Sequence, residues 1–309
     1  MKIASNSKFA ADTGLLALGA ALLVLLLASV ATFFYVGTHA TYDKEYISLA
    51  GEQRVLSQGI VKNATESASA NVTAFKLLRQ TRDQFENNLN LLHNGNPETR
   101  TPGAPEEMQE NLMAVDTLWK EFGKNADTVL RAEGTIRMLS EFVAAINETM
   151  PDLLALSDEV VSLMIESGAN ASQIYIASRQ LMLVPRISVN ANKVLQGGVG
   201  SSAAAERFGR DAALFGRVLN GMLKGDRRMN VSRVRDPDAR DKLKEVSEQF
   251  ETVHELVGRV LEQTPALFDA QKASTNMVKE SETLLASTTN LQNAFTQLGN
   301  NRFLTTNLA

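Results

Sequence analysis

Polar side chains that could bind an anion are concentrated on two helical turns between Gln53 and Gln58. Arg54 offers five N–H donors in a planar fork, a geometry that suits a carboxylate or another oxyanion. Ser57 adds a hydroxyl group beside the two amides. Because apolar residues continue to Ile60 at helical spacing, Arg54 is expected near the apolar stripe, where it could contact an anion in the interior or between two copies of the chain. The alternative is an exposed arginine whose aliphatic stem covers apolar surface.

A second group of polar residues repeats part of this pattern. Gln180 and Asn190 occupy the positions that Gln53 and Asn63 occupy in an earlier stretch of similar sequence. A polar residue repeated at a core-facing position can fix helix register or oligomeric state. It can equally face water. Gln180, Asn63 and Asn190 therefore join the candidate ligand-binding residues.

Pro185 interrupts a helical pattern and removes one backbone donor, so the sequence predicts a kink near Met182. Such a kink can open a cleft beside Arg186, the last candidate ligand-binding residue, or can mark a helix end. Further along, Arg207 and Asp211 have i, i+4 spacing and are expected to form a surface ion pair.

A local basic patch follows the glycine at position 225. Its members are Arg227, Arg228, Arg233, Arg235, Arg240 and Lys242. Such a patch could dock an acidic partner or anionic lipid head groups, although runs of this kind are commonly solvated loop.

Composition excludes several kinds of chemistry. The 309 residues include no Cys, and the three His residues, His39, His93 and His254, are far apart. No nucleophile elbow, phosphate loop or zinc-protease motif occurs. We therefore expect no catalytic residue, no metal site and no cofactor, and we expect that the chain is not an enzyme. The net charge of −4 argues against nucleic-acid binding, which normally requires a basic surface.

One segment is suited to a membrane. Residues 13–38 contain no charged side chain and exceed the ~20 residues that a helix needs to span the hydrocarbon core. Lys2 and Lys8 precede this segment, and no basic excess follows it. The positive-inside rule therefore predicts a cytoplasmic N-terminus at residues 1–12, a transmembrane helix at 13–38 and residues 41–309 outside the cytoplasm. A cleaved signal peptide is the alternative, but its apolar region would be shorter.

The remaining chain has a helical pattern almost throughout, with apolar residues recurring every three or four positions. Helix breaks are predicted at residues 94–105, 168–170, 197–200 and 225–226, where Gly, Asn and Pro cluster. Asp236 and Pro237 form an expected helix start, an N-cap followed by proline at the first helical position. The predicted fold class is all-α.

Three blocks of the chain recur in the same order, which indicates a duplicated helical module. Residues 50–63 align with 177–190, Phe85 and Gly95 align with Phe215 and Gly225, and Trp119 aligns with Phe250. This pattern predicts two tandem modules, residues 41–168 and 170–309, each an antiparallel bundle of about four helical segments. Periodicity common to all helix bundles is the alternative.

Two longer blocks carry a family resemblance. Residues 50–58, AGEQRVLSQ, continue to the sequence KNA at 62–64, and residues 208–219 read FGRDAALFGRVL. Both resemble the sensor region of type IV pili methyl-accepting chemotaxis transducers, and shorter matches such as residues 124–127 extend the resemblance over nearly the whole chain. The resemblance implies a periplasmic sensor of a pilus- or surface-related signal, anchored in the inner membrane of a Gram-negative-type bacterium and controlling twitching motility.

The same resemblance implies partners. It suggests a homodimer and contacts with pilin subunits, and signalling by rearrangement of packed helices. In this family a second membrane helix, a HAMP linker and a methyl-accepting hairpin pass the signal to a histidine kinase. The chain stops at Ala309 with none of these parts, so we expect a fragment or sensor-only product, with kinase coupling only where they are present.

Two alternative functions remain open. The motif at residues 50–54 also resembles the sensor domains of nitrate-responsive histidine kinases, in which an arginine at the position of Arg54 binds the anion at a dimer interface. Gly59 stands where those kinases often carry a further arginine. The other alternative is a membrane-anchored periplasmic tether or scaffold that transmits no signal.

Overall fold

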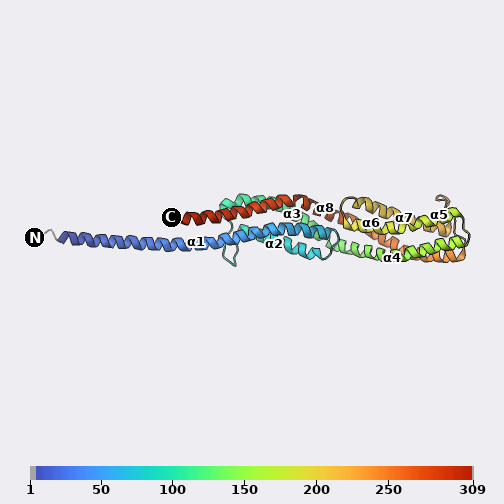
Figure 1. Cartoon of the computed structure of the whole chain (residues 1–309), viewed down its shortest axis with the longest axis horizontal. Coiled ribbons are helices and arrows are strands. Elements are labelled where there is room, and N and C mark those ends of the chain that lie inside the picture. Colours follow the sequence, from blue (N-terminus) through green and yellow to red (C-terminus); the bar gives the residue numbers. More distant parts are fainter. Residues whose placement is uncertain (1–4, 308–309) are drawn as a thin grey trace. The chain divides into compact units, whose positions relative to one another are not determined.

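The computed structural model describes the backbone of residues 5–307 and the side chains of residues 18–302. The described chain is almost entirely helical and contains no β-strand, which confirms the all-α fold class. The helices are α1 (Ser5–Ala68), α2 (Ala74–Asn94), a 3-10 turn η1 (Glu106–Met108), α3 (Gln109–Arg131), α4 (Glu133–Glu166), α5 (Ala171–Leu181), α6 (Leu183–Gln196), α7 (Ser201–Lys224) and α8 (Pro237–Asn307). Figure 1 shows these helices in sequence colours.

The first part of α1 has the properties of a membrane span. Among the described residues, α1 from Leu18 is the one helix long and apolar enough to cross a bilayer, with a mean hydropathy of 2.3 in its most apolar window. No protein covers this window, and Leu22 to Leu27 are all exposed. The hydroxyls of Ser29 and Thr32 donate to main-chain carbonyls four residues earlier, so the helix itself satisfies them. The part of the predicted span before Leu18 lies outside the described side chains.

The chain forms two compact units, each assembled from separated stretches. Unit 1 contains the described parts of Met1–Ser57, Asp83–Trp119 and Glu282–Ala309. Its core includes two aromatic pairs: Phe85 stacks on Trp119 with ring centroids 4.0 Å apart, and Tyr46 stacks on Phe295 at 5.2 Å. The first pair joins α2 to α3 within this unit, and the second joins α1 to α8.

Unit 2 contains Gln58–Arg82 and Lys120–Ser281. Its helix α4 has 34 residues, and its buried side chains recur at alternating steps of three and four. The residues in this series are Ile136, Leu139, Val143, Ile146, Met150, Leu153, Ser157, Val160 and Met164, and Val161 beside them is also buried. This spacing is the seven-residue repeat that packs long helices side by side. Phe215 of α7 contacts Phe250 of α8 with centroids 4.6 Å apart, which closes the same core.

Most predicted helix ends are confirmed. α2 ends at Asn94, α4 at Glu166, α6 at Gln196 and α7 at Lys224. α8 begins at Pro237, and the Asp236 carboxylate accepts a hydrogen bond from the Ala239 amide at 2.8 Å. The predicted interruption near Met182 is also confirmed, because α5 ends at Leu181 and α6 begins at Leu183. Pro185 has no N–H to donate to the Leu181 carbonyl, which weakens the helix at this point and favours the interruption.

Two helix junctions have no signal in the sequence. α1 ends at Ala68 and α2 begins at Ala74, although neither glycine nor proline separates them. Ala70 adopts a left-handed φ of 68°, which a non-glycine residue tolerates only where tertiary packing holds it. The α3–α4 junction at Ala132 is similarly unmarked.

Two turns have the same local geometry. Asn96 pairs with Thr101 after α2, and Asp226 pairs with Val231 after α7, each as an isolated antiparallel bridge. In the first turn the Ala104 amide donates to the Leu92 carbonyl at 2.8 Å, and in the second the Val234 amide donates to the Met222 carbonyl at 2.8 Å. Gly95 and Gly225 open the turns with φ of 86° and 87°. The division into two tandem modules stays a prediction, since each compact unit draws on several stretches of the chain.

Candidate functional site

Gln53 and Ser57 lie in the interior of unit 1 rather than on an open surface. The Gln53 side chain is fully buried, and its Nε2 donates to the Phe85 main-chain carbonyl at 3.0 Å. Its Oε1 is also buried and has no hydrogen-bond partner in the described structure. The Ser57 hydroxyl donates to the Arg54 carbonyl at 2.8 Å. Gln53 ties α1 to α2, whereas Ser57 bonds within α1, and neither side chain is accessible to a ligand from solvent.

Arg54 and Gln58 lie on the exposed side of α1. Among the described side chains, none forms an ion pair or hydrogen bond with the Arg54 guanidinium. The neighbouring Val55 is 67% exposed. Of the two readings left open by the sequence, the exposed arginine is therefore the one found in the single chain, because the helix phase turns Arg54 outward. An anion bound there would sit at the surface or between two copies of the chain.

Asn63 and Asn190 differ in environment despite their matched sequence positions. Asn63 is buried, and its Nδ2 lies 3.4 Å from the Thr81 hydroxyl of α2. Asn190 is partly exposed and donates to the Arg186 carbonyl of its own helix at 2.9 Å. Only Asn63 faces the core, so a shared register role for the two asparagines is not supported by their contacts.

Gln180 repeats the contact made by Gln53. It is buried in unit 2, its Nε2 donates to the Phe215 carbonyl at 3.0 Å, and its Oε1 lacks a described partner. A cavity of about 10 Å³ adjoins it, bounded by Ser157 and Met222 among others. That volume suits a single water molecule and excludes a larger ligand.

Arg186 forms an ion pair that the sequence did not indicate. Its Nη2 lies 2.9 Å from Oδ1 of Asp211 on α7. The Asp211 side chain is 7% exposed, whereas that of Arg186 is 55% exposed. The predicted surface pair between Arg207 and Asp211 is wrong, because Asp211 points into the packed side of α7 and Arg207 points outward.

The eight candidate residues therefore do not form one ligand pocket. They divide between buried helix-to-helix contacts and exposed positions, and they belong to both compact units. Within residues 18–302 no group of three or more His, Asp or Glu side chains is placed to hold a metal ion.

Sequence reasoning missed a polar site in unit 1 just beyond the apolar part of α1. Asp43 of α1 and Arg302 of α8 form an ion pair at 2.8 Å, and the Asp43 side chain is 8% exposed. A cavity of about 400 Å³ lies beside this pair and is also bounded by Tyr35, His39 and Asn300. Burial raises the pKa of Asp43, while Arg302 opposes that shift. No local pattern could reveal a pair separated by 259 positions.

Two side chains of α1 in unit 1, Glu45 and Tyr46, form hydrogen bonds with the turn after α2. The Glu45 carboxylate accepts hydrogen bonds from Asn96 at 2.6 Å, from Thr99 at 2.7 Å and from Thr101. Burial alone would raise the pKa of Glu45, but these hydrogen bonds together lower it. The Tyr46 hydroxyl donates to the Pro102 carbonyl at 2.8 Å, and burial raises the pKa of Tyr46 to about 12.

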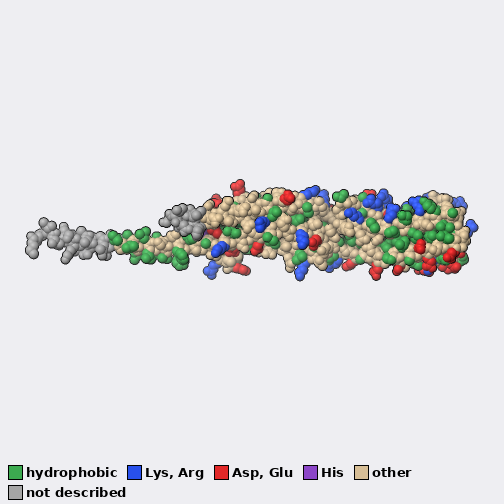
Figure 2. Space-filling model, in the orientation of Figure 1, with side chains coloured by type: hydrophobic (Ala, Val, Ile, Leu, Met, Phe, Trp, Pro, Cys, Tyr) green, Lys and Arg blue, Asp and Glu red, His purple; other side chains and the backbone are tan. Residues whose placement is uncertain are grey.

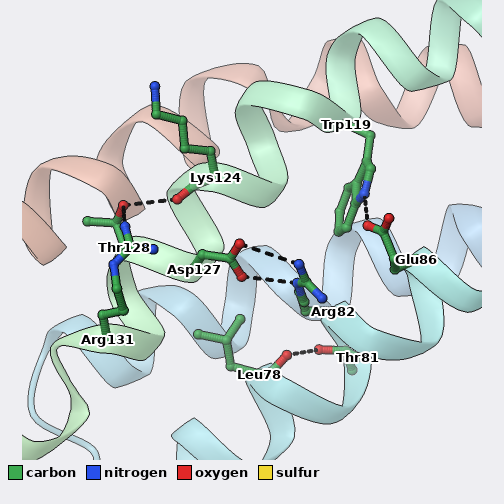
Figure 3. Close-up of polar contacts among 9 residues, drawn as sticks. All are labelled: Leu78, Thr81, Arg82, Glu86, Trp119, Lys124, Asp127, Thr128 and Arg131. Atoms are coloured by element: carbon green, nitrogen blue, oxygen red, sulfur yellow. Dashed lines mark hydrogen bonds and ion pairs between the residues drawn. The ribbon is translucent and has the colours of Figure 1, made fainter.

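Figure 3 shows how two polar contacts fasten α2 to α3. In unit 2 the Arg82 guanidinium faces Asp127, with Nε 3.1 Å from Oδ1 and Nη2 3.4 Å from Oδ2. In unit 1 the Trp119 indole donates to the Glu86 carboxylate at 2.5 Å. Asp127 belongs to the short motif at residues 124–127 that contributed to the family resemblance, so that motif has a structural role in joining helices.

The described residues thus define an all-helical protein in which one helix is long and apolar enough to cross a membrane, with polar contacts fixing helices within each unit. Residues 35–144 match the family described as "Type IV pili methyl-accepting chemotaxis transducer N-term". This match confirms, over residues 35–144, the resemblance inferred from the sequence.

Two curated relatives extend the match. The chain is 40% identical over 287 residues to Protein PilJ of Pseudomonas aeruginosa, an alignment that covers 92% of this chain and 42% of that protein. It is 38% identical over 281 residues to a putative methyl-accepting chemotaxis protein, AlkN, of Alcanivorax borkumensis, covering 91% of this chain and 40% of that protein. The chain thus spans about two fifths of the length of these relatives.

Proposed function

We propose that this chain is the sensor region of a chemoreceptor-type transducer that controls type IV pilus twitching motility. The observation that carries the proposal is the 40% identity to Protein PilJ over 92% of the chain. In this proposal residues 1–12 lie in the cytoplasm, α1 crosses the inner membrane and residues 41–309 lie in the periplasm. Coupling to a cytoplasmic kinase would depend on the parts of the relatives that this chain does not span.

Signal transfer in this proposal is a small sliding or rotation of α8 against α1. α1 runs without interruption from its apolar part to Ala68, so displacement of its exported part reaches the membrane directly. The Asp43–Arg302 pair joins α1 to α8 close to the apolar part of α1. A ligand would shift the equilibrium between two helix arrangements by its differential affinity for them.

The proposed signal is pilus- or surface-related, with pilin subunits as the partner and a homodimer as the working unit. The exposed face of α1 around Arg54 and Val55 is a suitable homodimer contact, because an apolar side chain and an unpaired guanidinium lie side by side there. A nitrate-like anion bound between two copies of Arg54 is the second candidate signal, supported by the same unpaired guanidinium. The absence of a catalytic role stays part of the proposal.

A chimeric receptor tests the main proposal. This chain replaces the matching N-terminal region of PilJ in Pseudomonas aeruginosa cells that lack PilJ, and the twitching zone is measured. Twitching restored by the chimera, and lost again with Asp43→Ala, is the expected result. A chimera that is present in the membrane in normal amount but never restores twitching would instead favour a tether that transmits no signal.

A further inference from the structure

The turn between α7 and α8 carries an unusual concentration of unpaired positive charge. We call it the arginine turn and define it as residues 225–236. Four of its arginines are exposed, and no described side chain forms an ion pair or hydrogen bond with their guanidinium groups: Arg227, Arg228, Arg233 and Arg235. The chain as a whole has a net charge of −4, so the positive charge of this turn is opposite in sign to that of the chain.

The two acidic residues of the turn form no described ion pair with these arginines, and four Arg against two Asp leave residues 225–236 with a net charge of +2. The Asp226 carboxylate accepts from the amides of Arg228 and Met229, at 2.8 and 3.2 Å. The Asp236 carboxylate accepts from the Ala239 amide at the start of α8. Both carboxylates therefore bind backbone amides, and the four guanidinium groups remain available to a partner.

A second turn of this chain shows whether the backbone geometry of the arginine turn requires its arginines. The turn after α2 has the same bridge, the same opening glycine and the same closing hydrogen bond as the arginine turn. At the positions that correspond to the four arginines, that turn carries Pro97, Glu98, Gly103 and Pro105. The backbone geometry consequently forms without arginine, so the fold of the turn does not explain the charge.

The arginine turn also forms one wall of a cavity of about 600 Å³ in unit 2. The opposite wall is the junction from Ser167 to Asn170, where α4 ends and α5 begins. Gln173 of α5 holds the two walls together, because its Oε1 accepts from the Ser232 amide at 2.8 Å. Arg233 and Arg235 line this cavity, and the start of α5 adds the partial positive charge of a helix N-terminus.

The basic surface continues along α7. Arg207, Arg210 and Arg217 are exposed, and their spacing places them on one side of the helix. Figure 2 shows Lys and Arg side chains gathered over the part of unit 2 that Figure 1 labels α6 and α7. A partner bound at the cavity would therefore meet further positive charge along this helix.

We propose that the arginine turn and its cavity dock an acidic segment of a partner protein, one rich in Asp and Glu side chains. Guanidinium groups bind carboxylates through paired N–H donors, and four of them can hold several carboxylates at once. The cavity is concave and can enclose part of a peptide, whereas a flat bilayer surface would meet only the protruding arginines. This inference goes beyond the proposed sensor role and holds equally for a tether.

The test uses the full chain in phosphatidylcholine nanodiscs and a fluorescein-labelled hexaglutamate peptide, with binding measured by fluorescence anisotropy. The variant R227Q/R228Q/R233Q/R235Q removes the charge of the turn. The matched control, K62Q/K76Q/K272Q/K279Q, removes four exposed lysines of the same unit that have no described ion pair. Lys272 lies about 50 Å along α8 from Pro237 by helix rise, so the control leaves the cavity unchanged.

The expected result is that the arginine variant binds at least about tenfold more weakly, while the lysine control stays within about twofold, because exposed ion pairs contribute little singly and add over four sites. A variant with all four arginines changed to lysine keeps the charge but loses the paired N–H donors, so its affinity should lie between those of the glutamine variant and the unsubstituted chain. Raising the salt from about 50 to about 200 mM weakens binding to the unsubstituted chain. Unchanged helical circular dichroism shows that each variant is folded.

Two outcomes would overturn the proposal. An equal loss of affinity in the arginine variant and the lysine control would show that the peptide responds to the total charge of the chain and not to the arginine turn. Binding of phosphatidylglycerol vesicles that depends on the four arginines, with no binding of hexaglutamate, would assign the surface to a membrane instead of a protein.

Discussion

The side-chain amide of Gln53 donates a hydrogen bond to the main-chain carbonyl of Phe85 at 3.0 Å, in the interior of unit 1. Gln180 makes the same bond to the Phe215 carbonyl at the same distance in unit 2. In both cases a glutamine binds the backbone of a later helix, α2 or α7, at a phenylalanine. Phe85 stacks on Trp119, and Phe215 contacts Phe250 in a tilted arrangement. The internal alignment of residues 50–63 with 177–190 matched the two glutamines, and the structure shows that they make the same hydrogen bond.

Replacing Gln53 with alanine should destabilise the chain by about 1–3 kcal/mol, because it removes a buried hydrogen bond and leaves a cavity. Chemical denaturation of the full chain in detergent, followed by circular dichroism, measures the change. The control is Gln58→Ala, which alters an exposed amide on the same helix and should change the free energy of unfolding by less than about 0.5 kcal/mol. Equal effects of the two substitutions would contradict the importance of the Gln53–Phe85 bond.

Removing Arg186 should expose the cost of a buried carboxylate. Arg186→Ala leaves Asp211 unpaired and is expected to lower the free energy of unfolding by about 1–2 kcal/mol, discounted because the Arg186 side chain is half exposed. Arg207→Ala is the matched control and should have little effect. If Arg207→Ala proved the more destabilising of the two, the assignment of Asp211 to Arg186 would be wrong.

Glu45→Gln should reduce stability near neutral pH, and the loss should shrink in acid. The pKa of Glu45 in the folded chain lies below its ordinary value of 4.5, so its ionised form stabilises the folded state above that value. This stabilisation is lost as the pH falls through the lowered pKa. We expect a difference of about 1 kcal/mol at about pH 7, reduced by solvent screening of the partly exposed carboxylate, and a smaller difference at about pH 3, measured by denaturation. Glu282→Gln, an exposed control, should show no such pH dependence.

Arg54→Ala should leave folding unchanged, because the side chain is exposed and has no described partner. If an anion binds there, nitrate should raise the thermal midpoint of the unsubstituted chain in detergent, and the substitution should abolish that rise. A rise with purified pilin subunits that survives the substitution would place pilin recognition elsewhere. A nitrate-induced rise that persists in the variant would remove Arg54 from the anion site.

Local chemistry explains what the sequence determined by itself. The apolar part of α1 follows from composition alone, because a long uncharged apolar run forms a helix that satisfies its own backbone hydrogen bonds in hydrocarbon. The end of α2 at Asn94, the break before Pro185 and the start of α8 at Pro237 follow from residues that alter the backbone directly. The family could be inferred because its motif at residues 50–58 is contiguous.

Tertiary packing decided the rest. The turn at Ala70 has no local signal, because packing rather than glycine holds its positive φ. The direction in which Arg54 points depends on which side of α1 the neighbouring helices cover, and periodicity left that open. Asp211 had a plausible partner four residues away, yet the fold offers it Arg186 on another helix. The Asp43–Arg302 pair joins α1 to α8 across most of the chain, and only the folded structure brings the two charges together.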